Sequence, residues 1–331
     1  MSGITPKPYY FLGFAIPLSV IIGNYIGGFY VASGTFLGLV VFPLLDILLG
    51  DGRDSNPEDA SPFFFDGVLY MHVLFQIIAI SSFLVFILSE PDLNLMILST
   101  LSTGLSTGIS GIVVAHELVH RKGFPKYCGY LLLWTAIYMH FETEHVRGHH
   151  RHVGTDLDPA SAKEEHGLLY FVLTTVPKQF ISSWKYGVQK SNSLFFHSLG
   201  LFLLIELVTL FSIHYIFGLT LLLAFIGQSA VAVYLLEYVN YIRHWGLRRE
   251  VTDKVTSQIS WQSNARLSRF VLVELTRHPD HHLFEYRPYQ SLRPYDDAPT
   301  LPSGYFACFY LAQIPFIWRR VMKNRIPVVI S

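Results

Sequence analysis

Six long apolar stretches divide this chain, and they restrict its possible folds more than any other feature. A transmembrane helix needs about 20 consecutive, mostly apolar residues. Stretches of this kind lie at about residues 9–31, 34–49, 68–89, 93–115, 194–217 and 219–240. The second is short and ends at Asp46, so we expect it to tilt or only just to span the bilayer. Because lipid cannot hydrogen-bond to peptide groups, the sequence predicts an all-α integral membrane protein with about six transmembrane helices.

The composition agrees with a membrane location and excludes other classes of protein. Charged residues make up 15% of the chain, against about 25% in soluble proteins. The formal net charge is zero and no basic patch is interleaved with aromatic residues, which argues against binding of nucleic acid. With only two cysteines, Cys128 and Cys308, the chain cannot build a disulfide framework or a four-thiolate metal site.

The distribution of basic residues predicts the orientation of the chain in the membrane. All 24 Lys and Arg residues lie in the N-terminal tail, the 50–67 loop, the 116–193 segment or the last 90 residues. None lies in the three other connections, near residues 32–33, 89–92 and 214–218. The positive-inside rule therefore predicts that both termini and the segments 116–193 and 241–331 lie in the cytoplasm, on the inner membrane if the source is bacterial.

The cytoplasmic segments alternate with the spans, so we expect residues 1–331 to form one membrane-embedded domain with a cytoplasmic helical cap. Two apolar stretches, at about 127–141 and 167–182, are too short to span and favour interfacial or re-entrant helices. Small residues on one face of the fourth span would let a neighbouring helix approach closely. These residues are Gly104, Gly108 and Gly111.

Four tight clusters contain nine of the fifteen histidines, and each cluster begins where an apolar stretch ends. Several pairs are spaced i and i+4, which places them on the same face of a helix. A neutral imidazole is the commonest side-chain metal ligand, and one ion uses three or four of them. The pattern therefore predicts two metal ions at a membrane surface. The expected ligands are His116, His120, His145, His149, His150, His244, His278, His281 and His282.

Other side chains are expected to hydrogen-bond to the ligand imidazoles rather than to bind metal, because ligating histidines usually donate their far N–H to a carboxylate, carbonyl or water. We name Glu117, Glu144, Asp156, Asp158, Asp280, Asn240 and His140 for this role. The remaining histidines are expected to pack or to be solvated. They are His72, His152, His166, His197 and His214.

Two other metal chemistries fit parts of the same pattern. The sequence from His116 through Glu117 to His120 matches the H-E-x-x-H motif of zinc proteases, in which the glutamate is the general base. Glu117 with His120, and Glu142 with His145, also match the Glu-x-x-His element of carboxylate-bridged di-iron bundles. Both alternatives leave most of the clustered histidines without a role. A metal transporter is a further alternative, but it should carry ionisable residues within its spans.

Five motifs of this chain resemble those of the membrane di-iron alkane hydroxylases (alkane 1-monooxygenases). The resemblance includes the order and spacing of the motifs and covers about residues 15–325. Within the wider group, lipid desaturases share the simpler histidine motifs, and xylene methyl hydroxylases are also members. Val119, Arg121 and Trp245 depart from the usual pattern. The motifs begin at His116, Glu144, Thr155, Asn240 and Arg277.

The resemblance implies a non-haem di-iron monooxygenase that inserts one atom of O2 into the terminal methyl of an alkane and yields a primary alcohol. It implies two iron ions as cofactors, O2 as co-substrate, a hydrophobic substrate and a location in the lipid bilayer. Hydroxylation of an alkylarene methyl group and desaturation or hydroxylation of a lipid are the alternatives.

The reaction also needs electrons that this chain cannot supply by itself. It has no Gly-x-Gly-x-x-Gly nucleotide motif after a strand and no paired Cys-x-x-Cys motifs. The resemblance implies a rubredoxin-type carrier with an NADH-dependent reductase. Basic residues in the C-terminal half are expected to receive such a carrier or to contact anionic lipid. They are Arg243, Arg248, Arg249, Arg319, Arg320, Lys323 and Arg325.

Overall fold

The computed structural model describes residues 5–89 and 91–327, and this part of the chain is helical without any β-strand. Six helical segments are long and apolar enough to cross a bilayer, which confirms the predicted all-α, multi-pass architecture. The described residues exclude both ends of the predicted domain, residues 1–4 and 328–331. They also exclude Glu90, which lies in the predicted connection near residues 89–92.

Three of the six spans are built from several helical pieces and three are single helices, and their bounds differ from the predicted ones at a few points. The first ends at Ile26 because Gly27 has φ +78° and cannot continue the helix. The last runs to His244, four residues beyond its predicted end at 240. The pieces are η1 (Lys7–Phe14) and α1 (Ala15–Ile26); η2 (Gly28–Ala32), α2 (Ser33–Phe36), η3 (Leu37–Val41) and α3 (Phe42–Leu48); α4 (Pro62–Leu88); α5 (Leu93–Ser106), η4 (Thr107–Ile112) and α6 (Val113–Val119); α11 (Ser198–Phe217); and α12 (Leu219–His244).

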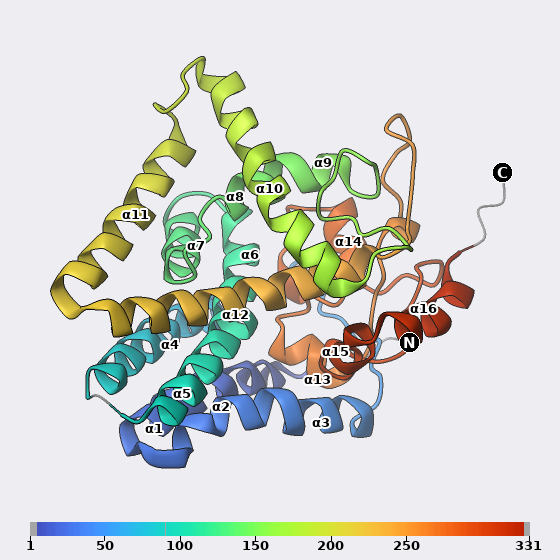
Figure 1. Cartoon of the computed structure of the whole chain (residues 1–331). Helices are drawn as coiled ribbons and strands as arrows, with labels where there is room; N and C mark the ends of the chain where they lie inside the picture. The colour runs from blue at the N-terminus through green and yellow to red at the C-terminus, as the bar shows by residue number, and fades with distance from the viewer. Residues whose placement is uncertain (1–4, 90, 328–331) are drawn as a thin grey trace.

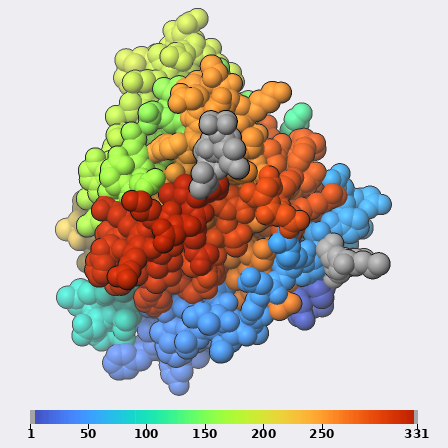
Figure 2. All heavy atoms as spheres, turned by 90° about the vertical axis from the view of Figure 1, so that its right-hand side faces the viewer, coloured from blue at the N-terminus to red at the C-terminus, as the bar shows by residue number. Residues whose placement is uncertain are grey.

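The remaining helices cover one end of this bundle. Figure 1 shows the turns from α1 to η2 and from α11 to α12 at the lower left, opposite the cap. Figure 2 looks onto the cap, where the chain that follows α12, coloured orange to red, covers much of the surface. The cap consists of α7 (Phe124–Thr135), α8 (Phe141–Thr143), η5 (Glu144–His149), α9 (His150–His152), α10 (Leu168–Ser191), η6 (Ser257–Ile259), α13 (Arg266–Val271), α14 (His278–Leu283), η7 (Tyr289–Ser291), α15 (Tyr305–Gln313), α16 (Pro315–Met322) and η8 (Lys323–Arg325).

A buried hydrogen-bonded cluster joins four helices inside the bundle. Gln76 of α4 donates to Thr107 of η4 at 2.9 Å, and Thr107 donates to Gln228 of α12 at 2.9 Å. Gln228 in turn donates to the backbone oxygen of Thr135 at the end of α7, at 2.8 Å. Because lipid offers these groups no partner, pairing between helices satisfies them and fixes how the helices pack.

Glycines allow α5 and α12 to approach closely, as the sequence indicated. A Cβ atom added at Gly104 would lie 2.5 Å from the Cβ of Val231 and 2.7 Å from the backbone oxygen of Gln228. One added at Gly108 would lie 2.8 Å from Leu235. Gly111 faces α4 instead, with Gln76 at 3.3 Å. The fourth span therefore uses its small residues against two different neighbours.

We predict that Gly104→Ala destabilises the protein, because the added methyl group forces α5 and α12 apart. Overpacking of this kind lowers the free energy of unfolding by about 1–3 kcal/mol. Unfolding followed by circular dichroism in detergent micelles measures the change. Gly67→Ala on α4 is the matched control, since nothing lies within 4 Å of its added Cβ. Equal stability of the two variants would contradict the close α5–α12 contact.

Candidate metal centre

All nine histidines predicted as ligands meet in one buried region, although four separate segments carry them. α6 and the residue after it provide His116 and His120, and α12 ends in His244. Figure 1 shows α6, α9, α14 and the end of α12 converging near the centre of the view. The other six come from η5 with α9 and from α14; they are His145, His149, His150, His278, His281 and His282.

The histidines form two groups. In the first, the Nε2 atoms of His120 and His145 are 3.0 Å apart, and His150 Nε2 lies 3.1 Å from His145 Nε2. His150 Nε2 also lies 3.0 Å from His281 Nε2. The candidate ligand atoms of His116, His120, His145 and His281 all lie within 4.8 Å of one another. With His150, this group holds five imidazoles.

The second group holds four imidazoles. The candidate ligand atoms of His149, His244, His278 and His282 lie within 4.8 Å of one another, and all four residues are buried. The Nε2 atoms of His278 and His282 are 2.9 Å apart. η5 is a π-helical segment, a feature frequent at functional sites. It sends His145 to the first group and His149 to the second.

These nitrogen positions fit a metal ion. Two imidazole nitrogens bound at about 2.1 Å and at right angles to a common ion would be about 3.0 Å apart. Hydrogen bonding cannot replace such an ion, because the Nε2 of His150 carries at most one proton yet contacts two other Nε2 atoms. The Nε2 atoms of His116, His149 and His244 are buried without a partner among residues 5–89 and 91–327. A bound metal would satisfy all of these nitrogens.

Burial keeps the imidazoles of the cap in the neutral form that binds metals. Desolvation, together with the charge of Lys126, lowers the pKa of His120 to about 4. Burial and the neighbouring imidazoles lower the pKa of His145 well below the usual value near 6.5. The same holds for His150, His278, His281 and His282. Near neutral pH these rings therefore offer a lone pair rather than a positive charge.

Two acceptors orient imidazoles of the second group through their Nδ1 atoms. His149 donates to Asp158 at 2.9 Å, and His244 donates to the backbone oxygen of Ile259 at 3.3 Å. Both contacts leave the lone pair on Nε2, where a metal would bind.

His278 is held differently, because its Nδ1 faces Arg243 NH1 at 3.1 Å and a guanidinium only donates. A neutral ring that accepts this hydrogen bond carries its proton on Nε2, so the contact with Arg243 must change when the Nε2 of the neutral imidazole binds a metal.

Most of the side chains expected to orient the ligands lie elsewhere. Glu117 pairs with Arg121 at 2.9 Å, and the exposed Asp156 pairs with Lys163. Asp280 receives two hydrogen bonds from Arg287. Of the residues named for this role, Asp158 contacts a ligand imidazole directly, whereas Asn240 acts one step away, through Arg243 at 2.6 Å.

Two further residues named for this role are buried beside the site. The pKa of Glu144 is raised to about 8 by burial and by nearby carboxylates, and one of its oxygens has no partner among the described residues. The ring of His140 packs edge-on against Tyr138, with centroids 4.2 Å apart. Sequence reasoning missed Glu285, which lies 3.8 Å from the Nδ1 of His150.

The alternative metal chemistries do not fit this arrangement. Glu117 is turned to Arg121, away from the position of a general base in a zinc protease. Glu142 pairs with Lys126 at 2.7 Å, so neither Glu-x-x-His element offers its carboxylate to either histidine group. The groups found among the described residues consist of imidazoles, apart from Glu285 beside His120 and His150.

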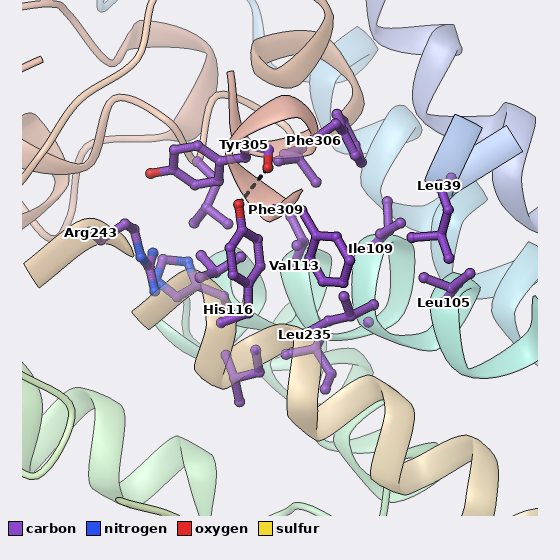
Figure 3. Close-up of a pocket in the computed structure, with 18 residues that line it drawn as sticks. Leu39, Leu105, Ile109, Val113, His116, Leu235, Arg243, Tyr305, Phe306 and Phe309 are labelled. Atoms are coloured by element: carbon purple, nitrogen blue, oxygen red, sulfur yellow. Dashed lines mark hydrogen bonds between the residues drawn. The ribbon is translucent and has the colours of Figure 1, made fainter. Parts of the chain in front are cut away.

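An apolar slot leads from the spans to the first histidine group. The empty space between its lining residues is about 650 Å³, part of which is open to the outside, and the slot is shown in Figure 3. Leu39 and Leu105 line one end, and His116 and Arg243 line the other. Between them lie residues of η4, α6, α12 and α15, among them Ile109, Val113, Leu235, Phe306 and Phe309. A long, apolar molecule in this slot would reach the histidines with one end.

Comparison with known proteins agrees with these features. The family model for fatty acid desaturases matches residues 93–312. Alkane 1-monooxygenase 1 of Pseudomonas aeruginosa is 39% identical over 68% of this chain and 62% of its own length. Alkane 1-monooxygenase 2 of Alcanivorax borkumensis is 34% identical over 97% of this chain and 91% of its own length. The hydroxylase component of a Pseudomonas putida xylene/toluene monooxygenase is 29% identical over 90% of this chain and 83% of its own length.

We predict that Asp158→Asn weakens metal binding by the second histidine group. The change removes the negative charge that holds the Nδ1–H of His149, and such a loss typically lowers metal affinity about 10–100-fold. Metal bound per chain, measured by elemental analysis after dialysis against increasing chelator, checks this. Asp156→Asn, two residues away but exposed, should retain the metal of the unmodified protein. Identical retention curves for the two variants would contradict the role of Asp158.

Proposed function

This chain belongs to the alkane 1-monooxygenase family, and we propose that it inserts one atom of O2 into the terminal methyl group of an alkane, which gives a primary alcohol. The apolar slot that ends at His116 is the observation that carries this proposal. An alkane has no polar group for recognition, so its binding free energy must come from apolar burial, at about 0.8 kcal/mol per CH2. The slot provides such burial and places one end of the chain beside the first histidine group.

We infer that the two histidine groups hold two iron ions. His116, His120, His145, His150 and His281 would bind one ion. The second group, His149, His244, His278 and His282, would bind the other. Bound iron supplies the O2 activation that no protein side chain can perform on an unactivated C–H bond. Imidazole ligands suit iron, although they suit zinc and copper as well.

The residues of the slot would position the substrate and exclude water. Leu235, Ile109 and Val113 contact the methylene groups from two sides. His116 is both a slot residue and a member of the first group, so the slot and the metal site share one side chain. The position of His116 would decide which carbon of the chain approaches the iron, and a linear chain inserted end-on presents its terminal methyl.

Methyl hydroxylation of an alkylarene is a second candidate, supported by the xylene/toluene monooxygenase relative. The several alkane 1-monooxygenase relatives, at 31–39% identity, favour the alkane instead. Because the chain also matches the fatty acid desaturase family model, a lipid substrate is a third candidate.

We further propose that a rubredoxin-type protein with an NADH-dependent reductase supplies the electrons. Insertion of one oxygen atom reduces the other to water and needs two electrons beyond those of the substrate. A cleft between η5 and α10 offers one docking position, since it is lined by Arg147, Arg151, Lys178 and Lys185 and adjoins the turn that carries His145. Arg319, Arg320, Lys323 and Arg325 are exposed and offer a second. The expectation of a surface position for Arg243 is wrong, because that side chain is buried.

Product analysis tests the proposed reaction. Iron-loaded protein in lipid nanodiscs, given O2, NADH, rubredoxin, its reductase and a mixture of octane and xylene, should release 1-octanol. Hydroxylated xylene as the main product would favour the arene reading, and new double bonds in the lipid would favour a desaturase. Omission of rubredoxin should abolish product formation. His116→Ala should lose turnover, whereas His214→Ala, exposed on α11 and outside both groups, should retain it.

We propose that the cap faces the cytoplasm of a bacterial inner membrane, because the basic residues lie on that side of the spans. A reporter enzyme that is active only outside the cytoplasm should give a signal when fused after Ser89. The same reporter fused after Ser331 should give none. A signal from the second fusion would mean that the histidine groups face away from the cytoplasm, which contradicts the proposed orientation.

A further inference from the structure

The inner end of the apolar slot contains two polar atoms that nothing in the described protein satisfies. The Nε of Arg243 and the hydroxyl of Tyr305 are buried without a hydrogen-bond partner among residues 5–89 and 91–327. Each residue is 1% exposed, and both line the slot. Figure 3 shows them together at the end opposite Leu39 and Leu105. A buried polar group without a hydrogen bond costs free energy. Two such groups in the wall of one slot therefore indicate a ligand that hydrogen-bonds to both.

Two nitrogens of the Arg243 guanidinium have partners, which leaves its Nε without a hydrogen bond. Its NH1 contacts the Nδ1 of His278 at 3.1 Å, and its NH2 donates to Asn240 at 2.6 Å. Asn240 donates in turn to Glu237 at 3.0 Å, which also accepts from Gln179 at 2.9 Å. The buried carboxylate of Glu237 thus balances the guanidinium charge of Arg243 through the intervening Asn240. An ionisable group fixed at such depth in a membrane protein is expected to serve a function.

Tyr305 is fixed through its backbone, which leaves its hydroxyl free. Its carbonyl oxygen accepts from the hydroxyl of Tyr238 at 2.5 Å, and its amide donates to Ser268 at 2.8 Å. Neither contact uses the phenolic oxygen. The ring therefore keeps its position with or without a ligand, and the hydroxyl can both donate and accept.

We propose that Arg243 and Tyr305 form a polar subsite that binds the terminal hydroxyl of a long-chain primary alcohol, with the alkyl chain lying in the apolar slot. The alcohol oxygen accepts from the Nε–H of Arg243, and its hydroxyl hydrogen bonds to the oxygen of Tyr305. An alkane of equal length fills the same slot but leaves both atoms unpaired. The subsite rests on the proposed function, in that the alcohol is the product formed beside it.

The charge of the subsite favours a neutral hydroxyl over a carboxylate. Through Asn240, the guanidinium of Arg243 is already balanced by Glu237. A carboxylate in the slot would add a second negative charge to this desolvated region, and burial of an uncompensated charge is expensive. The slot should therefore rank ligands of equal chain length with the alcohol first and both the alkane and the fatty acid below it.

Equilibrium binding without turnover tests the subsite. Iron-loaded protein in nanodiscs, kept without any electron donor, is titrated with radiolabelled 1-dodecanol, dodecane and dodecanoate. A hydrogen bond to a charged group should make the alcohol bind about tenfold more tightly than the alkane. Tyr305→Phe and Arg243→Lys should each weaken 1-dodecanol binding several-fold and leave dodecane binding unchanged. Tyr234→Phe is the matched control, because its hydroxyl bonds to Gln313 outside the slot.

Iron content is measured in every variant, so that loss of metal is not mistaken for loss of the subsite. Tyr305→Phe keeps the aromatic ring and should retain the iron of the unmodified protein. Equal affinity of this variant and the unmodified protein for 1-dodecanol overturns the proposal, as does tighter binding of dodecanoate than of the alcohol. Either result leaves the proposed hydroxylation intact, since that reaction is judged by its products.

Discussion

The close approach of buried imidazole nitrogens is the constraint on which the rest of this structure depends. The Nε2 of His150 lies about 3 Å from the Nε2 atoms of both His145 and His281, an arrangement that hydrogen bonds alone cannot satisfy. Burial holds these rings neutral. A helical bundle brings the carriers together, because His116 of α6 and His244 at the end of α12 lie beside the cap helices that carry the other histidines. The spans therefore act as a scaffold whose inner ends define the centre.

The interior of the bundle balances two opposing demands. Polar groups such as Gln76 and Gln228 are paired between helices and fix the packing, whereas the slot between η4, α12 and α15 is kept apolar. This separation leaves an apolar slot inside protein that is itself held together by polar contacts. Arg243 lies where the two environments meet, buried between the slot and the second histidine group.

Patterns that repeat along a helix were readable in the sequence, and orientations set by loops were not. The i, i+4 spacing and the position of each cluster after an apolar stretch were sufficient to select the nine histidines that the structure brings together. The number of spans followed from the length and hydropathy of the apolar stretches, although the break at Gly27 depended on a local backbone conformation. Asp158 and the exposed Asp156 looked equivalent. In the structure, the amide of Ala160 and the hydroxyl of Ser161 donate to the Asp158 carboxylate and hold it toward the interior. The same limit explains Arg243, which the positive-inside rule assigned to the surface although its turn of α12 faces the histidines.

The π-helical segment η5 has a geometric consequence. It carries His145 and His149, members of different histidine groups, and His150 follows directly in α9. Both groups therefore take histidines from one short, continuous stretch of main chain, and no carboxylate links the two four-histidine groups within the described residues. The separation of two bound ions would then be a property of this backbone rather than of a bridging ligand. Insertion or deletion of a single residue in η5 would change the distance between the ions without removing any histidine.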